Sequence, residues 1–109
     1  MFQKTLRSLF PVILSLFICF PAASLAAEDI VIGVPSSLKT LEASEALKAI
    51  TMAVEEINAA GGVKVGDEMR PFQIESIDTR GGEPGVPISD ALMAIEKLFL
   101  EKKPDAVVL

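Results

Sequence analysis

Hydrophobic and polar residues follow each other along the chain with two different spacings, which predict helices and strands in turn. Between residues 40 and 60, apolar or small residues recur at intervals of three and four, so they fall on one face of a helix. The members of this face are Ala43, Leu47, Ile50, Val54 and Ile57. Gly61 and Gly62 follow, and glycine ends helices because it takes the left-handed conformation without a Cβ clash. The pattern therefore predicts an amphipathic helix that stops at a pair of glycines.

A second amphipathic helix is predicted over residues 89–102. Its apolar face consists of Ile88, Ala91, Leu92, Ile95, Leu98 and Phe99. The hydroxyl of Ser89 is suited to cap the N-terminus, and Lys102 and Lys103 suit the negative C-terminal end of the helix dipole. Pro104 then stops the helix, so we expect the segment to be capped at both ends.

Three further segments predict strands. Residues 29–34 are apolar after Asp29 and do not alternate, which is typical of a strand covered on both faces in a parallel sheet. Residues 72–77 mix polar and apolar side chains and predict a half-exposed strand, and residues 105–109 indicate a third strand. A turn-rich connector over residues 66–71 and a loop rich in glycine and proline over residues 78–87 flank the second strand.

The resulting βαβαβ order predicts an α/β fold, in which a parallel sheet carries helices on its faces. Because the first strand is apolar and the second is mixed, we expect the first in the centre and the second at the edge, a strand order beginning 2-1-3. Right-handed crossovers then place the two helices on opposite faces and begin a doubly wound sheet. Ligands of such sheets bind at the carboxyl ends of the strands where the winding direction changes, so residues 35–40 should line the crevice.

The first 26 residues form a different kind of segment. Lys4 and Arg7 give it a positive start, and residues 9–20 are uncharged and almost wholly apolar. Small residues near its end offer a cleavage point between Ala26 and Ala27. We therefore expect residues 1–26 to be a secretory signal peptide, and residues 27–109 to be the exported part.

Two alternatives for this segment stay open. Residues 9–27 carry no charge and are nearly long enough for an uncleaved membrane anchor, although Pro11 and Pro21 argue against it. A lipoprotein signal would use Cys19, but Ile18 is bulkier than the small residue expected before a lipidated cysteine. At the other end, a strand over residues 105–109 with no turn after it leads us to expect an N-terminal piece of a longer protein.

Charge and composition exclude several classes of partner and of chemical reaction. Without Lys4 and Arg7 the chain keeps eight basic and fifteen acidic residues, a net charge of −7, which disfavours nucleic acid or an anionic membrane as a partner. Cys19 is the only cysteine and would leave with the signal, so we expect no disulfide partner. Histidine is absent, and neither of the common glycine-rich nucleotide-binding motifs follows the first strand. We therefore expect a binding protein rather than an enzyme, with no catalytic residue, no metal and no cofactor.

Several segments resemble the N-terminal lobe of the periplasmic substrate-binding proteins of branched-chain amino acid ABC transporters, which have the leucine-binding-protein-like, type I periplasmic binding fold. The segments that carry the resemblance are Ile30-Val31-Ile32-Gly33-Val34, the helix end from Ala53 to Val63, Asp78, and Lys103-Pro104-Asp105-Ala106-Val107-Val108. The resemblance covers nearly all of residues 27–109, and its most specific part is the helix end with its double glycine.

The resemblance implies a two-lobed periplasmic protein that closes on a small polar solute and delivers it to the membrane permease of an ABC importer. Such proteins hold the solute's carboxylate and ammonium groups with hydroxyls and backbone groups of several loops, including the loop after the first strand. Ser36 and Ser37 lie in that loop and are the ligand-binding candidates. The resemblance makes a branched-chain or other amino acid the default ligand, although the loop lacks the glycines and aromatic residues that are frequent in the family.

Other readings of these residues remain. Ser36 and Ser37 can instead close turns, Lys39 can be solvated, and Asp78 is expected to order its own loop. A flavodoxin-type enzyme would also place hydroxyls after the first strand, although its phosphate loop would need glycines. A ligand-sensing extracytoplasmic receptor domain of the same fold is the second alternative, because fold does not fix function.

Overall fold

The structure, a computed structural model, describes residues 28–109. The predicted signal peptide, residues 1–26, and its predicted cleavage point between Ala26 and Ala27 lie outside the described residues. The strands are β1 (Ile30–Ser36), β2 (Val63–Val65), β3 (Glu68–Arg70), β4 (Phe72–Asp78) and β5 (Ala106–Val107). The helices are α1 (Leu41–Ala59) and α2 (Ile88–Lys97), and α2 continues into a turn of π-helix, η1 (Leu98–Lys102).

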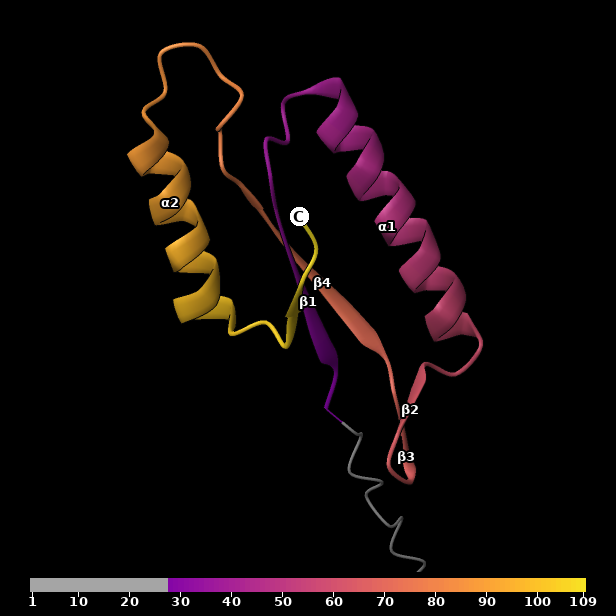
Figure 1. Cartoon of the computed structure of the whole chain (residues 1–109). Coiled ribbons are helices and arrows are strands. Elements are labelled where there is room, and N and C mark those ends of the chain that lie inside the picture. The colour runs from indigo at the N-terminus through magenta and orange to yellow at the C-terminus, as the bar shows by residue number, and fades with distance from the viewer. Residues whose placement is uncertain (1–27) are drawn as a thin grey trace, which may run out of the picture.

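A parallel three-stranded sheet in the order β4-β1-β5 forms the centre of the fold (Figure 1). β1 pairs with β4 along its whole length, from Ile30 opposite Phe72 to Ser36 opposite Asp78. β1 also carries the buried residues Gly33, Val34 and Pro35, as expected for a central strand without polar alternation. The prediction of a mixed α/β fold with a parallel sheet is therefore confirmed at this level.

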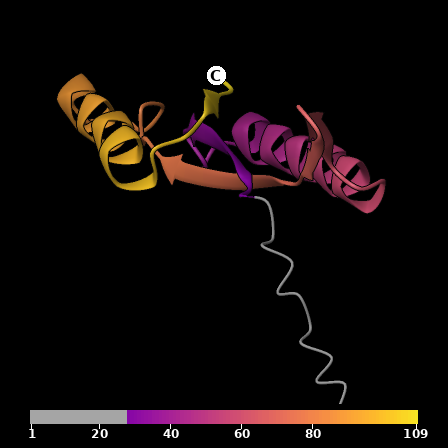
Figure 2. The same cartoon turned by 90° about the horizontal axis from the view of Figure 1, so that it is seen from below.

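The two helices cover opposite faces of this sheet (Figure 2). Val34 lines a cavity together with residues of α1, whereas a Cβ atom added to Gly33 would lie 3.1 Å from Cδ2 of Leu98, at the end of α2. Successive strand residues point to opposite faces, so α1 and the junction of α2 with η1 lie on different sides of β1. Gly33 thus gives the buried Leu98 side chain room to approach the strand.

The C-terminus of α1 ends as the glycine pair predicts. The backbone N–H of Gly61 donates to the carbonyl oxygen of Asn58 at 3.0 Å, and that of Gly62 donates to Ile57 at 2.9 Å. These two bonds form a Schellman motif, which satisfies the last carbonyls of the helix. Gly62 has a φ of +89°, and a Cβ there would lie 2.4 Å from the carbonyl oxygen of Arg70. The second glycine is therefore required both by its backbone angle and by the neighbouring strand.

The structure differs from the sequence prediction in the connector over residues 66–71. Instead of an irregular turn, β2 and β3 form an antiparallel hairpin in which Val63 lies opposite Arg70 and Val65 lies opposite Glu68. Gly66 and Asp67 close it, because glycine at φ +61° suits a two-residue hairpin turn. The three-residue strands are too short to show a period of two in the sequence.

The start of α2 also differs from the prediction. Pro87, not Ser89, is the N-cap residue, and no side chain caps this end of the helix. The extended backbone of Pro87 leads directly into the helix, so Ser89 already lies inside the first turn. The prediction that Ser89 caps the helix is therefore wrong. Serine has a side-chain oxygen suited to capping and proline has none, but the helix begins one residue after Pro87.

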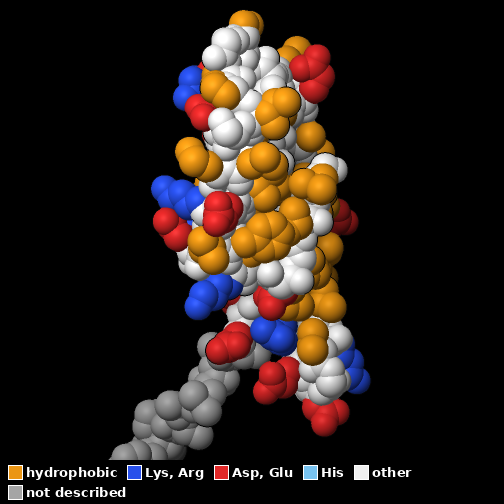
Figure 3. Space-filling model, turned by 60° about the vertical axis from the view of Figure 1, so that its left-hand side comes forward, with side chains coloured by type: hydrophobic (Ala, Val, Ile, Leu, Met, Phe, Trp, Pro, Cys, Tyr) orange, Lys and Arg blue, Asp and Glu red, His pale blue; other side chains and the backbone are white. Residues whose placement is uncertain are grey.

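The apolar face of α2 is only partly buried. Leu98 is 1% exposed, whereas Leu92 is 61% exposed and Ile88 is 80% exposed. Apolar side chains gather along the outer surface of the molecule, on the side where α2 lies (Figure 3). Within residues 28–109, no helix combines the length and the apolar character that a membrane crossing requires.

Candidate functional site

A cavity of about 270 Å³ lies at the carboxyl end of β1, between α1 and the residues that follow β5. We call it the strand-end cavity. Its lining residues are Val34, Pro35, Ser36, Ala43, Ala46, Leu47, Ala49, Ile50, Val108 and Leu109. Among these, Ser36 brings the only side-chain hydroxyl, and no charged side chain contributes to the lining. The cavity therefore offers an aliphatic surface with one polar group.

Ser36 is the last residue of β1 rather than part of the following loop, because β1 extends two residues beyond the predicted strand. Its carbonyl oxygen accepts two backbone hydrogen bonds, from Leu38 at 3.0 Å and from Thr79 at 2.9 Å. The second bond joins the end of β1 to the residue after β4. The backbone of Ser36 is thus held from both sides, and Ser36 is among the residues that line the strand-end cavity.

Ser37 makes a different set of contacts. Its hydroxyl oxygen accepts from the backbone N–H of Gly82 at 3.0 Å and lies 3.4 Å from the hydroxyl oxygen of Thr79. The Thr40 hydroxyl donates to the Ser37 carbonyl oxygen at 3.0 Å and also accepts from Ala43, which caps α1. Ser37 therefore ties the loop after β1 to the loop after β4, and it is not among the residues lining the strand-end cavity.

Asp78 connects the same two loops through one carboxylate oxygen. Its Oδ1 accepts from the backbone N–H of Leu38 at 3.2 Å and from that of Arg80 at 3.0 Å. Asp78 therefore orders its own loop, as expected, and also holds the neighbouring one. We call the contacts of Asp78 with Leu38, and of Ser37 with Thr79 and Gly82, the inter-loop clamp.

Thr79 is the residue of this region that sequence reasoning missed. Its side chain is 9% exposed, and its hydroxyl oxygen lies 3.4 Å from both the Ser37 hydroxyl and the backbone nitrogen of Gly81. The available signal was its position, because it follows the carboxyl end of β4 and adjoins Asp78.

The two loops that the clamp joins also carry charged side chains, which form ion pairs with each other. Glu83 lies 3.1 Å from the ammonium of Lys39 and 3.3 Å from the guanidinium of Arg80. The Lys39 ammonium is the main cause that holds the pKa of Glu83 below its ordinary value; desolvation opposes it, and Arg80 adds to it. Within residues 28–109, Oε1 of Glu83 has no hydrogen-bond partner, and its contact with Lys39 is an ion pair. Lys39, in the loop after β1, is thus paired with the loop after β4.

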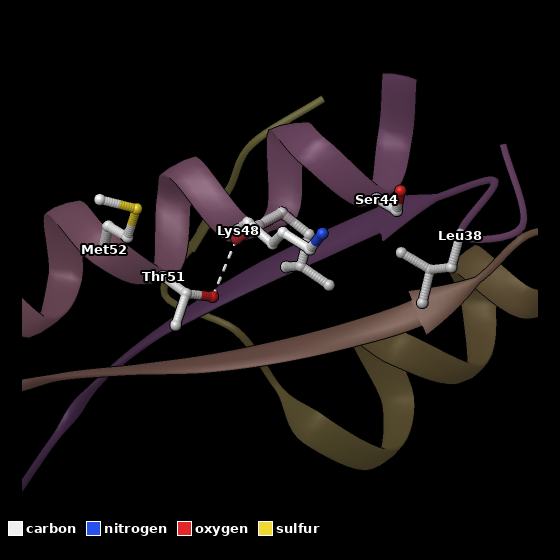
Figure 4. Close-up of a pocket in the computed structure, with 6 residues that line it drawn as sticks. Leu38, Ser44, Lys48, Thr51 and Met52 are labelled. Atoms are coloured by element: carbon white, nitrogen blue, oxygen red, sulfur yellow. Dashed lines mark hydrogen bonds between the residues drawn. The ribbon is translucent and has the colours of Figure 1, made fainter. Parts of the chain in front are cut away.

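A larger hollow of about 530 Å³ lies along α1, next to Leu38 (Figure 4). Its lining residues are Leu38, Ser44, Leu47, Lys48, Thr51 and Met52. The hydroxyls of Ser44 and Thr51 donate to carbonyl oxygens of their own helix, at 2.9 and 2.8 Å. The Lys48 ammonium pairs with Glu45 at 2.7 Å. Because its polar groups are already engaged, this groove is the weaker candidate despite its size.

Residues 28–109 bring together no group of three or more side chains that suits a metal ion. No protein-family model matches the chain, and no curated protein matches it in sequence. The likeness to branched-chain amino acid-binding proteins accordingly stays a prediction.

Proposed function

We propose that the protein is the solute-binding component of an ABC importer. It captures a small polar solute between two lobes in the periplasm, after removal of its signal peptide, and delivers the solute to a membrane permease. The observation that carries this proposal is the position of Ser36, which is among the residues lining a cavity at the carboxyl end of the central strand. Ligands of open α/β sheets bind at this end, where the connections of neighbouring strands leave toward opposite faces of the sheet.

The finer fold assignment belongs to the same proposal. β1 with β4 and β5 on its two sides, and helices on opposite faces, are compatible with the start of a doubly wound sheet of order 2-1-3. In the proposed protein this sheet is part of the first lobe, and a second lobe supplies the other wall of the site.

The lining of the strand-end cavity favours a solute with an aliphatic part. Alanine, valine, leucine and isoleucine side chains make up most of the wall, and burying aliphatic surface against them stabilises a complex by about 25 cal/mol per Å². The Ser36 hydroxyl can donate one hydrogen bond and accept others. The carboxylate and ammonium of an amino acid would need further partners from backbone groups and from the second lobe. A branched-chain amino acid therefore remains the default solute.

A thermal-shift titration tests the proposal. The protein is titrated with L-leucine and L-valine, and with amides, small carboxylates and polyols as competing classes. A solute at 100 times its dissociation constant is expected to add roughly 2.7 kcal/mol to the free energy of unfolding. An absence of any shift with the aliphatic amino acids would remove the default solute.

Two matched serine variants locate the site. Ser36→Ala is expected to weaken L-leucine binding by about 0.5–1.5 kcal/mol, the net value of one hydrogen bond. Ser44→Ala, in the larger groove along α1, is expected to leave the affinity unchanged. Equal affinities of wild type and both variants would contradict a site at Ser36.

A further inference from the structure

We infer that Asp78 is a positioning residue for the solute site: its carboxylate fixes the Leu38 amide, which also contacts the Ser36 carbonyl oxygen, and so steadies the end of β1 at which Ser36 lines the strand-end cavity. This inference rests on the proposed function, because the site it refers to is the proposed solute site. It concerns a residue on the neighbouring strand, which does not itself line the cavity.

The register of the sheet puts Asp78 in the right place. Ser36 and Asp78 are the last residues of two paired parallel strands and lie opposite each other. From there, one carboxylate oxygen accepts from Leu38, two residues after Ser36, and from Arg80 in its own loop. The same Leu38 N–H also approaches the Ser36 carbonyl oxygen at 3.0 Å. The Leu38 amide is thus shared between Ser36 and Asp78.

The other contacts of the inter-loop clamp determine how far the structure loosens when the Asp78 carboxylate is removed or displaced. Ser37 still contacts Thr79 and Gly82, and the backbone N–H of Thr79 still donates to Ser36. Loss of the Asp78 oxygen should therefore loosen the loop rather than unfold the sheet. A loop that spends only a fraction of its time in the binding conformation binds more weakly by that fraction. If about a tenth of the molecules keep the conformation, the affinity falls roughly tenfold.

Two substitutions at Asp78 distinguish the effect of the position of its acceptor oxygen from the effect of its negative charge. Asp78→Asn removes the charge but keeps an acceptor oxygen at the same distance along the side chain. Asp78→Glu keeps the charge but moves the oxygens by one methylene group. If Asp78 positions the loop, Asp78→Glu disturbs it and Asp78→Asn does not. If the negative charge itself contacts the solute, the order is reversed. Glu75→Ala is the matched control, because Glu75 lies on the same strand and pairs with Lys102 instead.

The experiment measures two quantities on wild type and the three variants: amide hydrogen exchange at Leu38 and Arg80 without solute, and the affinity for L-leucine by calorimetry. We expect exchange at both amides to be about tenfold faster in Asp78→Glu and unchanged in Asp78→Asn and Glu75→Ala. The affinity for L-leucine should fall roughly tenfold in Asp78→Glu alone.

Each result has one meaning. Unchanged exchange in Asp78→Glu, or faster exchange in Asp78→Asn, overturns the inference whether or not a solute binds. Changed exchange with unchanged affinity also overturns it, because the loop would then not position the site. If wild type binds no aliphatic amino acid, the default solute is removed, and the exchange rates at Leu38 and Arg80 still decide whether Asp78 holds the loop. Both Asp78 variants retain a polar side chain, so the comparison does not rest on truncating Asp78 to alanine.

Discussion

The side-chain amide of Asn58 pairs with both backbone groups of Phe72: it donates to the Phe72 carbonyl oxygen and accepts from the Phe72 N–H, each at 2.8 Å. Asn58 lies in the last turn of α1, and Phe72 begins β4. The two bonds therefore fix where the strand starts relative to the end of the helix. They also explain why an asparagine precedes the glycine pair in the most specific segment of the sequence.

The Asn58 pairing predicts a large stability effect for a polar residue. Asn58→Ala leaves two partly buried backbone groups without partners and is expected to lower the free energy of unfolding by about 1–3 kcal/mol. Gln73→Ala, which removes an exposed amide bonded to the Glu75 carboxylate, should change it by less than about 0.5 kcal/mol. Urea denaturation of both variants gives the comparison, and equal stabilities would contradict the pairing.

Two glycines with positive φ should respond differently to alanine. Gly66→Ala meets no atom within 4 Å, so only the strained backbone costs energy, about 1 kcal/mol. Gly62→Ala has a similar backbone cost and also brings its Cβ against the Arg70 carbonyl oxygen. We expect it to destabilise the protein by about 3 kcal/mol or more, because a backbone atom must move. A smaller effect for Gly62→Ala than for Gly66→Ala in thermal unfolding would refute the close approach.

Two leucines of the same predicted apolar face provide a test of its burial. Leu98→Ala removes a buried side chain that packs near Gly33 and is expected to cost about 2–5 kcal/mol. Leu92→Ala removes a mostly exposed side chain and should cost less than about 0.5 kcal/mol. Chemical denaturation at a single protein concentration measures both. Comparable losses would mean that Leu92 is covered in solution.

The pKa of Glu83 predicts how stability changes with pH. Lys39 is the main cause that holds this pKa below the ordinary value of 4.5. The folded state therefore favours the carboxylate, and this contribution to stability is present above pH 4.5 and is lost as the pH falls through the folded-state pKa. Lys39→Met should move the Glu83 pKa upward in an NMR titration. Lys64→Met, on the hairpin at the other end of β4, serves as the control and should leave it unchanged.

Much of the fold follows from periodicity. The helix α1, its glycine stop and the apolar β1 were all predicted, because each is a local pattern that burial or backbone geometry requires. Of the predicted apolar face of α1, Val54 is buried, whereas Ile57 is 37% exposed. The hairpin over β2 and β3 was missed because its strands have three residues each. The exposure of Ile88 and Leu92 was also not predictable, because periodicity identifies an apolar face but not what covers it.

The candidate site was predictable in position but not in detail. Ligands bind at the carboxyl ends of strands where the winding direction changes, and this rule predicts Ser36 and Ser37 equally well, since both follow the same apolar segment. Only the end of β1 at Ser36, and the turn of Ser37 toward Gly82, assign them different surroundings. The contribution of Thr79 depends on a contact across 42 residues, which no local pattern encodes.

The hairpin has a practical consequence. Its turn at Gly66 and Asp67 has open space around it and precedes β4, whereas Asp78 ends that strand. Seven residues of strand separate the two ends by roughly 20 Å. A fluorophore or a short affinity tag inserted at this turn should therefore report on the protein, or immobilise it on a sensor, without disturbing the loops at the opposite rim.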